Sequence, residues 1–520
     1  MNGAQNLLAS LADSGIEVCF ANPGTSEMHL VSAIGGSDRV RAVLCLFEGV
    51  VSGAADGYAR MTDRPALTLL HLGSGFSNSM ANQHNAMRAH VPLVNMVGDH
   101  ADYHLQYDSP LTSDIAAHAR IVSDWVRVSE SADDLALAGA QAVKASLRGA
   151  GKIATFIAPA NHAWEEAATA VEPLERDAPA PVARATVEAA AARLRNGRRT
   201  VLLLGGRALR EDALQATGRI AASCGARLLS EVFATRLQRG VGRVPVERLP
   251  YFAEEAVAAL AGTEQLILVG ADAPVAFFAY PGKPSLLAPE ECEVHTLASV
   301  DEDIAGALAD LDALLGAATE AAVVPQAPPP LPPAGPLTPL AIGLSLCRSL
   351  PDNAIVVDEA ATCGMGLFPA TVTAPAHDWL MLTGGAIGDG LPLSLGAAIA
   401  CPERKVVALQ ADGSAMYTLQ ALWSIAREQA DVTVVLLNNR SYAILNIELA
   451  RVGAGHPTPK TLSMLDLSRP DLDFVVLAEG MGVKASRATS AEEFDQQFAA
   501  AVAAPGPHLI EAIVQQQVPV

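Results

Sequence analysis

The chain of 520 residues is too long for a single hydrophobic core, so we expect several domains. Half of its residues are apolar and 18% are charged, which is typical of a globular protein and excludes a disordered one. Lys and Arg number 35 against 56 Asp and Glu, and the resulting net charge of −21 argues against nucleic acid or an anionic membrane as a partner.

The seven cysteines are dispersed, with no CxxC pair and no cluster with histidine. That distribution is typical of reduced thiols rather than of disulfides or zinc ligands. The first residues lack the features of a signal peptide, and no apolar run reaches membrane-spanning length. We therefore expect a cytoplasmic protein.

In the first third of the chain, apolar strands alternate with amphipathic helices. The pattern predicts strands at 17–20, 43–47, 66–70, 93–97 and 153–157, with helices such as 49–61 and 76–88 between them. This alternation predicts a mostly parallel sheet with helices on both faces.

Two segments without apolar periodicity divide the rest of the chain. Residues 171–182 are rich in Pro, Glu and Ala, and residues 327–339 form a proline-rich spacer. Between them we expect strands at 200–204, 265–269 and 293–297, and after them strands at 354–357 and 380–382. We expect an α/β protein of three doubly wound parallel-sheet domains, over residues 1–170, 183–320 and 338–520.

The most informative stretch spans residues 405–442. Residues 405–410 and 432–437 are predicted to be buried strands, with a helix over 415–428 between them. Polar loops follow both strands, and in open parallel sheets ligands bind at these strand ends. The first loop holds Asp412, Gly413 and Ser414 at a helix start, which favours phosphate, and the second holds Asn439. Carboxylate and amide oxygens suit Mg²⁺, although by itself this pattern also fits an ordinary strand–helix–strand unit with a capping aspartate.

Further polar or glycine-rich positions follow other predicted strands. They are the loop Asn22-Pro23-Gly24-Thr25-Ser26, Glu48 at a strand–helix junction, His71 before a glycine turn, His100 and His104 on a loop, and the turn Gly384-Gly385-Ala386-Ile387-Gly388. Each has an ordinary structural interpretation as a turn, a helix cap or a packed side chain. An imidazole such as that of His71 also suits proton transfer near neutral pH.

Taken together, these motifs resemble those of the thiamine-diphosphate-dependent 2-oxoacid decarboxylase and acetolactate synthase superfamily. They occur in the family's order: the NPGT loop, the Glu48 segment, His71, the GGAIG turn, ADGS and the Asn pair. The resemblance covers essentially the whole chain and is closest to benzoylformate decarboxylase and the acetolactate synthase large subunit. One departure is Ala411, which stands where the family has the first glycine of its Gly-Asp-Gly motif.

The resemblance implies roles for these residues. Asp412, Asn439 and the Ser441 carbonyl would bind Mg²⁺, while Gly413 and Ser414 would hold the diphosphate. Glu48 would hydrogen-bond the aminopyrimidine and activate the cofactor, together with the Gly385 carbonyl and the wedge side chain of Ile387. Thr25 and His71 would act on the substrate, in a pocket lined also by His100, His104, Tyr442, Ile444, Leu445 and Phe278.

The resemblance also implies a pyrimidine-binding first domain, a flavin-free central domain and a C-terminal diphosphate- and Mg²⁺-binding domain. FAD is not expected, because the central segment lacks GxGxxG. By the same resemblance we expect benzoylformate decarboxylase-like, non-oxidative decarboxylation of a 2-oxoacid, with carboligation of the enamine intermediate to a second carbonyl as a further outcome. The alternatives are an acetolactate synthase-type carboligase, an FAD-containing oxidase or synthase, and an inactive cofactor-binding homologue. The minimal active unit would be a homodimer, assembling into a homotetramer.

Overall fold

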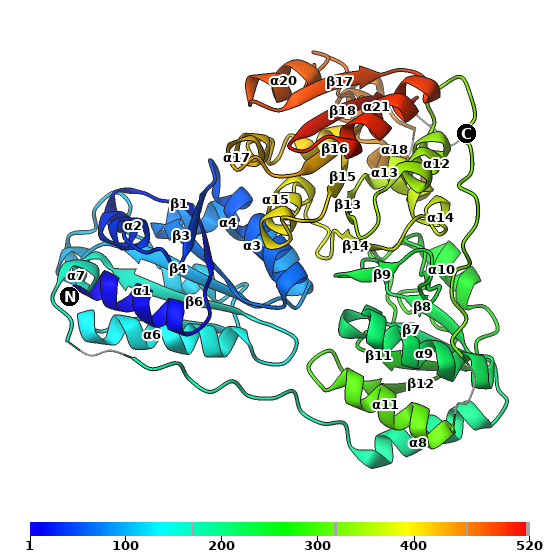
Figure 1. Ribbon diagram of the computed structural model, residues 1–520, viewed down its shortest axis with the longest axis horizontal. Helices are drawn as coiled ribbons and strands as arrows, with labels where there is room; N and C mark the ends of the chain where they lie inside the picture. The colour runs from blue at the N-terminus through cyan, green and yellow to red at the C-terminus, as the bar shows by residue number, and fades with distance from the viewer. Residues whose placement is uncertain (169–170, 317–319, 454–455, 516–520) are drawn as a thin grey trace.

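The computed structural model describes residues 1–168, 171–316, 320–453 and 456–515. It contains three sheets, in which the strands are parallel except for one edge strand, with helices on both faces. In Figure 1 the first unit lies at the left, the middle unit at the lower right and the last unit at the upper right. The α/β class predicted from the sequence is therefore confirmed. The predicted domain boundaries stay a prediction, and residues 170 and 520, on which two of them fall, lie outside the described residues.

The first sheet has six parallel strands, in the spatial order β2 (Arg41–Leu44), β1 (Val18–Asn22), β3 (Ala66–His71), β4 (Leu93–Asp99), β6 (Ile153–Pro159) and β5 (Trp125–Val128). Its helices are α1 (Gly3–Asp13), α2 (Met28–Gly35), α3 (Glu48–Thr62), α4 (Leu72–Arg88), α5 (Ile115–Ala119), α6 (Ala132–Ser146) and α7 (Ala160–Trp164), with short 3₁₀ turns η1 (Thr25–Glu27) and η2 (Asp102–Tyr107). The prediction of a strand over 43–47 was wrong beyond residue 44, because Phe47 already caps helix α3.

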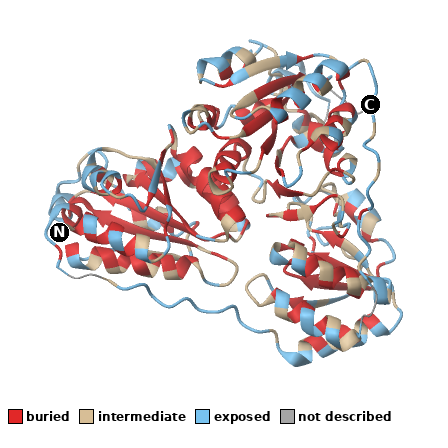
Figure 2. Cartoon of the chain, in the orientation of Figure 1, coloured by how far each residue is buried: buried red, intermediate tan, exposed pale blue. Residues whose placement is uncertain are grey.

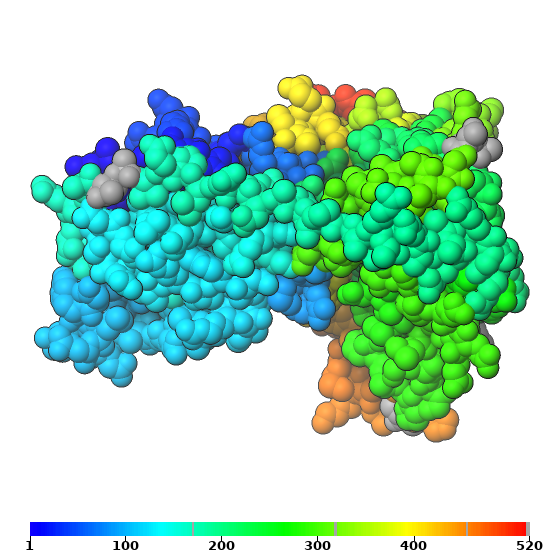
Figure 3. Space-filling view, turned by 90° about the horizontal axis from the view of Figure 1, so that it is seen from below, coloured from blue at the N-terminus to red at the C-terminus, as the bar shows by residue number. Residues whose placement is uncertain are grey.

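The middle sheet has five parallel strands, in the order β10 (Glu247–Arg248), β8 (Arg227–Ser230), β7 (Thr200–Leu204), β11 (Gln265–Val269) and β12 (Glu293–Ala298). Around it lie α8 (Arg184–Arg195), α9 (Glu211–Cys224), α10 (Ala253–Leu260), α11 (Ile304–Leu315) and the 3₁₀ turn η3 (Gly206–Leu209). Seen from below, the first unit lies at the left and the middle unit at the right, with parts of the last unit visible at the edges (Figure 3).

The last sheet has seven strands, in the order β17 (Lys484–Ala488), β18 (His508–Ile513), β16 (Val432–Asn438), β15 (Val406–Ala411), β13 (Ile355–Glu359), β14 (His377–Met381) and β9 (Leu237–Arg239). Strand β9 comes from the middle segment and pairs antiparallel with β14. The helices of this unit are α12 (Pro339–Ser349), α13 (Ala361–Gly364), α14 (Leu367–Ala370), α15 (Gly390–Ala400), α16 (Asp412–Ala415), α17 (Ala421–Arg427), α18 (Ala443–Arg451), α19 (Pro459–Ser463), α20 (Phe474–Gly480) and α21 (Ala491–Ala503).

The single helix predicted over 415–428 was wrong. The structure has two short helices instead, α16 and α17, separated by a turn in which Met416 is 42% exposed. The apolar spacing that predicted one helix therefore overestimated its length, because Met416 does not pack into the core.

Helices α3 and α15 join the first and last units through a close contact, and both are buried along most of their length (Figure 2). A Cβ atom added to Gly57 would lie 2.1 Å from the Leu393 carbonyl oxygen, and one added to Gly396 would lie 1.9 Å from that of Ala54. The two backbones can approach this closely only because these positions are glycine. The contact holds together the two units that carry the predicted site residues.

Candidate active site

Two predicted metal-binding residues follow neighbouring strands of the last sheet. Asp412 comes directly after β15, and Asn439 comes directly after β16. The Asp412 carboxylate accepts hydrogen bonds from the backbone N–H groups of Gly413, at 2.9 Å, and Arg440, at 2.7 Å. Burial raises the pKa of Asp412 to about 6, so the carboxylate lies where a cation would compensate its charge.

The loop after β16 is folded back on itself. The Asn439 side-chain oxygen accepts from the Ser441 N–H at 3.0 Å, and the Ser441 hydroxyl donates to the Leu465 carbonyl at 3.2 Å. The ring of Tyr442 lies over Gly413, where an added Cβ would come within 2.5 Å of the Tyr442 Cε1 atom. The structure thus brings Asp412, Gly413, Asn439, Ser441 and Tyr442 into one cluster.

Cys363 was not predicted to belong to this cluster. It lies on α13, which follows β13, the strand beside β15. The Asn439 side-chain amide donates to the Cys363 sulfur at 3.2 Å, and burial raises the pKa of the thiol to about 11. A buried, protonated thiol is inert, so Cys363 acts as a packing and hydrogen-bonding neighbour of Asn439.

The turn from Gly384 to Gly388 is held in place by side chains of α4. The Asn85 amide donates to the Ala386 carbonyl at 2.8 Å, and the Asn82 amide donates to the Gly388 carbonyl at 3.1 Å. The neighbouring Gly385 has φ +75°, a conformation that glycine adopts at little cost. Helix α4 of the first unit therefore fixes the position of Ile387, whose side chain is half-buried.

Glu48 is the first residue of α3, and its side chain is buried. Its Oε2 accepts a hydrogen bond from the Asn78 amide at 3.0 Å. A Cβ added to Gly75 would lie 3.0 Å from Glu48 Oε1 and 3.3 Å from His71 Cβ, so both residues pack against this glycine. The structure thus brings these two predicted residues together.

His71 has a partner that the sequence did not reveal. Its Nδ1 lies 2.9 Å from the Oε2 of Glu27, a carboxylate that is completely buried. Glu27 also accepts from the Gly24 N–H at 2.6 Å, and Gly24 leaves room for the imidazole because an added Cβ would lie 2.1 Å from His71 Nδ1. A carboxylate on Nδ1 orients the imidazole and leaves Nε2 directed away from Glu27. The only signal in the sequence was a glutamate two residues after Thr25.

The other predicted pocket residues are more dispersed. Thr25 is exposed at the start of η1, and His100 and His104 follow β4 with their ring centroids 5.6 Å apart. Ile444 and Leu445 lie on the first turn of α18, directly after the cluster around Asn439. Phe278, which is 58% exposed, lies instead near Glu448 and Arg451 at the other end of α18.

The donor set fits magnesium and a diphosphate. One buried carboxylate and one amide oxygen are hard oxygen ligands, and Mg²⁺ commonly takes one or two protein carboxylates plus oxygens of a phosphate ligand. The described part of the chain holds no group of three or more His, Cys, Asp or Glu side chains arranged for a metal, so a site made entirely of such side chains is not found there. When bound, thiamine diphosphate would supply an electron sink for decarboxylation.

Two family models match the chain. The N-terminal TPP binding domain of thiamine pyrophosphate enzymes matches residues 1–118, and their C-terminal TPP binding domain matches residues 364–512. The fold and the cluster at the strand ends thus define a thiamine pyrophosphate enzyme.

Full-length relatives agree with this assignment. The chain is 53% identical to the Mycobacterium tuberculosis protein named "Putative acetolactate synthase large subunit IlvX", with 99% of each chain covered. It is 29% identical to benzoylformate decarboxylase of Pseudomonas aeruginosa, with 96% of each covered. The chain belongs to the thiamine-pyrophosphate-dependent decarboxylase and acetolactate synthase family.

Solved structures show the same fold over the full length. The thiamine diphosphate-dependent 4-hydroxybenzoylformate decarboxylase of Rhodococcus jostii superposes with a TM-score of 0.86 at 25% identity, covering 99% of each chain. Benzoylformate decarboxylase of Polynucleobacter necessarius superposes with a TM-score of 0.85 at 20% identity, covering 100% of each chain, and supports the fold alone. Within the described ranges, no helix is both long and apolar enough to cross a membrane.

Proposed function

We propose that the protein uses thiamine diphosphate and Mg²⁺ to decarboxylate a 2-oxoacid without oxidation, releasing an aldehyde. The observation that carries this proposal is the pairing of His71 with the buried Glu27 at 2.9 Å, beside Glu48. A decarboxylase must deliver a proton to the carbon that has lost CO₂, and an oriented imidazole suits that step. The names of the relatives that are benzoylformate decarboxylases support the same reaction class.

The resemblance to the family supports roles for the other residues. Asp412, Asn439 and the Ser441 carbonyl hold the metal, and Gly413 and Ser414 hold the diphosphate. Glu48 hydrogen-bonds the aminopyrimidine, while the Gly385 carbonyl and Ile387 fix the ring orientation. Thr25 binds the substrate carboxylate, and His71 carries the proton, with the side chains of His100, His104, Tyr442, Ile444 and Leu445 enclosing the substrate. Phe278 is left out, because it lies at the other end of α18.

A second outcome is carboligation, in which the decarboxylated fragment is added to a second carbonyl compound instead of being protonated. The name of the 53% identical relative favours this acetolactate synthase-type reaction. The two reactions share the residues that bind the cofactor and differ in whether a proton or a carbonyl reaches the reactive carbon.

A panel of 2-oxoacids, assayed for CO₂ and for aldehyde with and without an added acceptor aldehyde, separates the two. Equal amounts of CO₂ and aldehyde support the decarboxylase, while CO₂ with a hydroxyketone in place of aldehyde supports the carboligase. CO₂ release from none of the 2-oxoacids by protein saturated with both cofactors would contradict the proposal.

We propose further that two copies of the chain build each active site, as part of a homodimer or homotetramer in the cytoplasm. Among the described residues, no hydrogen bond joins Glu48 or His71 to Asp412 or Asn439. Large apolar side chains are exposed beside both groups, at Tyr103, Leu105, Tyr107 and Leu111 and at Met416, Tyr417 and Leu445. Such surfaces suit burial against a second copy. None of the seven cysteines forms a disulfide, which suits a reducing compartment.

Subunit mixing tests the shared site. Glu48→Gln and Asp412→Ala subunits, each inactive alone, should regain about a quarter of the wild-type activity after random exchange, because half of the dimers then carry one intact site. No recovery after exchange, with heterodimers verified by mass spectrometry, would show that each site lies within one chain.

A further inference from the structure

A cavity of about 460 Å³ lies between the middle and last units, away from the proposed cofactor site. Its walls come from β9 and β10, from the segment leading into α10, and from the α13–α14 region of the last unit. The lining residues are Arg239, Val246, Glu247, Arg248, Pro250, Tyr251, Phe252, Glu255, Met365, Phe368, Pro369 and Val372.

Arg239 is a buried cation that no described carboxylate approaches to ion-pair distance. It is 6% exposed, and its guanidinium carbon lies 3.8 Å from the centroid of the Phe368 ring. It donates to the Thr371 hydroxyl at 2.9 Å and to the Phe368 carbonyl at 2.7 Å, which are both neutral acceptors. Burial and the nearby Arg248 lower the pKa of Arg239 to about 9, so the group is still charged at neutral pH.

Arg248 is the second guanidinium on the same ring, 5.0 Å from the centroid of Phe368. Its NH1 has only long contacts, at 3.8 Å to Asp358 Oδ2 and at 3.9 Å to Met381 Sδ. No described residue offers it an oxygen acceptor at hydrogen-bonding distance. Arg248 therefore lines the cavity with donors that protein oxygens do not satisfy.

The charges around the cavity do not balance. Among the described residues, the half-buried carboxylate of Asp358 acts on both guanidinium groups, so one negative charge stands against two positive charges there. Of the two glutamates at the rim, Glu247 pairs with Arg227 and Glu255 is exposed to solvent, where its charge is screened. Buried charges are normally paired, so the cavity suits a single negative charge.

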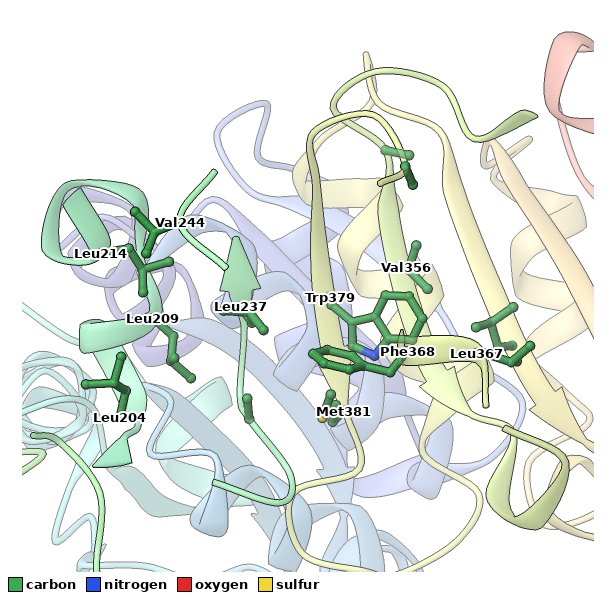
Figure 4. Close-up of a cluster of buried hydrophobic side chains, with 14 of the residues drawn as sticks. Leu204, Leu209, Leu214, Leu237, Val244, Val356, Leu367, Phe368, Trp379 and Met381 are labelled. Atoms are coloured by element: carbon green, nitrogen blue, oxygen red, sulfur yellow. The ribbon is translucent and has the colours of Figure 1, made fainter. Parts of the chain in front are cut away.

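Aromatic rings supply the rest of the wall. Phe368 packs edge-on against Trp379, with the ring centroids 5.4 Å apart, and Figure 4 shows the two rings together. Tyr251 and Phe252 of the middle unit also line the cavity. Aromatic side chains in the lining favour a planar apolar group beside them.

We propose that this cavity is a second binding site, which takes a small aromatic monocarboxylate, with its carboxylate on Arg248 and its ring against the aromatic side chains of the lining. The guanidinium fork of Arg248 matches a carboxylate, and one such ligand balances the charge of the cavity. The ligand would also contact Met365, two residues after Cys363, whose sulfur accepts the hydrogen bond from Asn439. A ligand in the cavity would thus contact the segment that packs against Asn439 of the proposed metal loop.

Fluorine NMR with 4-fluorobenzoate as the probe tests the site on the full-length protein saturated with thiamine diphosphate and Mg²⁺. Wild type should bind the probe, and Arg248→Gln should bind it about 10- to 150-fold more weakly, since a hydrogen bond to a charged group is lost. Arg184→Gln is the control, because Arg184 is an exposed arginine on α8 that pairs with Glu188 outside the cavity, and it should bind as wild type. Thermal unfolding verifies that each variant folds.

Met365→Trp is a second variant that fills the mouth of the cavity and leaves both arginines in place, and it should also prevent binding. 4-Fluorobenzylamine, which carries the opposite charge, should not bind. Undiminished affinity in both Arg248→Gln and Met365→Trp would overturn the proposal. Displacement of the probe by equimolar inorganic phosphate would also overturn it, because it would indicate a site for any small anion. Loss of the probe signal in His71→Ala, with Arg248→Gln unaffected, would place the probe in the substrate pocket instead.

Discussion

The pairing of Glu27 with His71 allows the proposed proton transfer to be tested in detail. Glu27→Gln keeps the size of the side chain but removes its charge and turns one acceptor into a donor. The Glu27 carboxylate has no exposed surface and accepts from Gly24, Ser26 and His71, so the new amide hydrogens would face a donor. We expect the imidazole of His71 to lose its fixed orientation.

The size of the effect follows from this geometry. A hydrogen bond to a charged group contributes about 1.5–3 kcal/mol, which corresponds to a fall in kcat of about 10- to 150-fold. Replacing His71 by alanine removes the proton carrier itself and should lower kcat by about 10²–10⁴-fold. Neither change alters a residue of the cluster around Asp412, so the affinity for cofactor and Mg²⁺ should stay unchanged.

The decisive measurement is a double-mutant cycle on single-turnover decarboxylation. If Glu27 acts only through His71, the variant with both substitutions should be no slower than His71→Ala alone, so the two effects should not add. Additive losses of rate would refute this reasoning, because Glu27 would then act independently of the imidazole. Unfolding experiments on the same samples are the control, since a structural role alone predicts a loss of stability with unchanged turnover per folded molecule.

Three further outcomes are expected. Asp412→Ala should abolish the binding of thiamine diphosphate and Mg²⁺, because it removes the one charged metal ligand, and calorimetry showing unchanged affinity would disprove the metal assignment. Glu48→Gln should leave cofactor binding nearly intact but slow hydrogen–deuterium exchange at the C2 position of the bound cofactor, followed by NMR; a wild-type exchange rate would remove Glu48 from its proposed role. Burial and the neighbouring Asp56 raise the pKa of Asp389 well above its usual value, although Arg60 lies 3.7 Å away. The folded protein therefore holds a proton that the unfolded chain has lost above the ordinary aspartate pKa of about 4, so this residue makes stability fall as pH rises from there towards its raised pKa. Asp389→Asn should reduce that fall, as measured by denaturant unfolding at pH 5 and pH 8, and an identical pH dependence in wild type and variant would contradict the assignment.

The sequence by itself determined the α/β class, the three sheets and the order of the family motifs. Buried parallel strands are continuous apolar runs, so the strands at 200–204 and 265–269 were predicted with their observed bounds. The polar residues after β15 and β16 could also be located, because the carboxyl ends of parallel strands meet at one edge of a sheet. Local sequence patterns were sufficient for these strands because each strand is an apolar run that can be recognised without its neighbours.

Only the tertiary structure decided which distant residues meet. Glu27 and His71 are 44 positions apart, and Asn85 meets Ala386 across 301 positions, so no local period relates them. The prediction of one helix over 415–428 was wrong for the same reason, because the burial of Met416 depends on which residues pack against it in the folded chain. The two arginines beside the Phe368 ring, Arg239 and Arg248, come from β9 and β10 of the middle segment. They meet Phe368 of the last unit only in the folded chain, where β9 pairs with β14 of the last sheet. Burial and charge compensation are properties of the packed chain, and a sequence pattern reports them only where the packing partners are close in sequence.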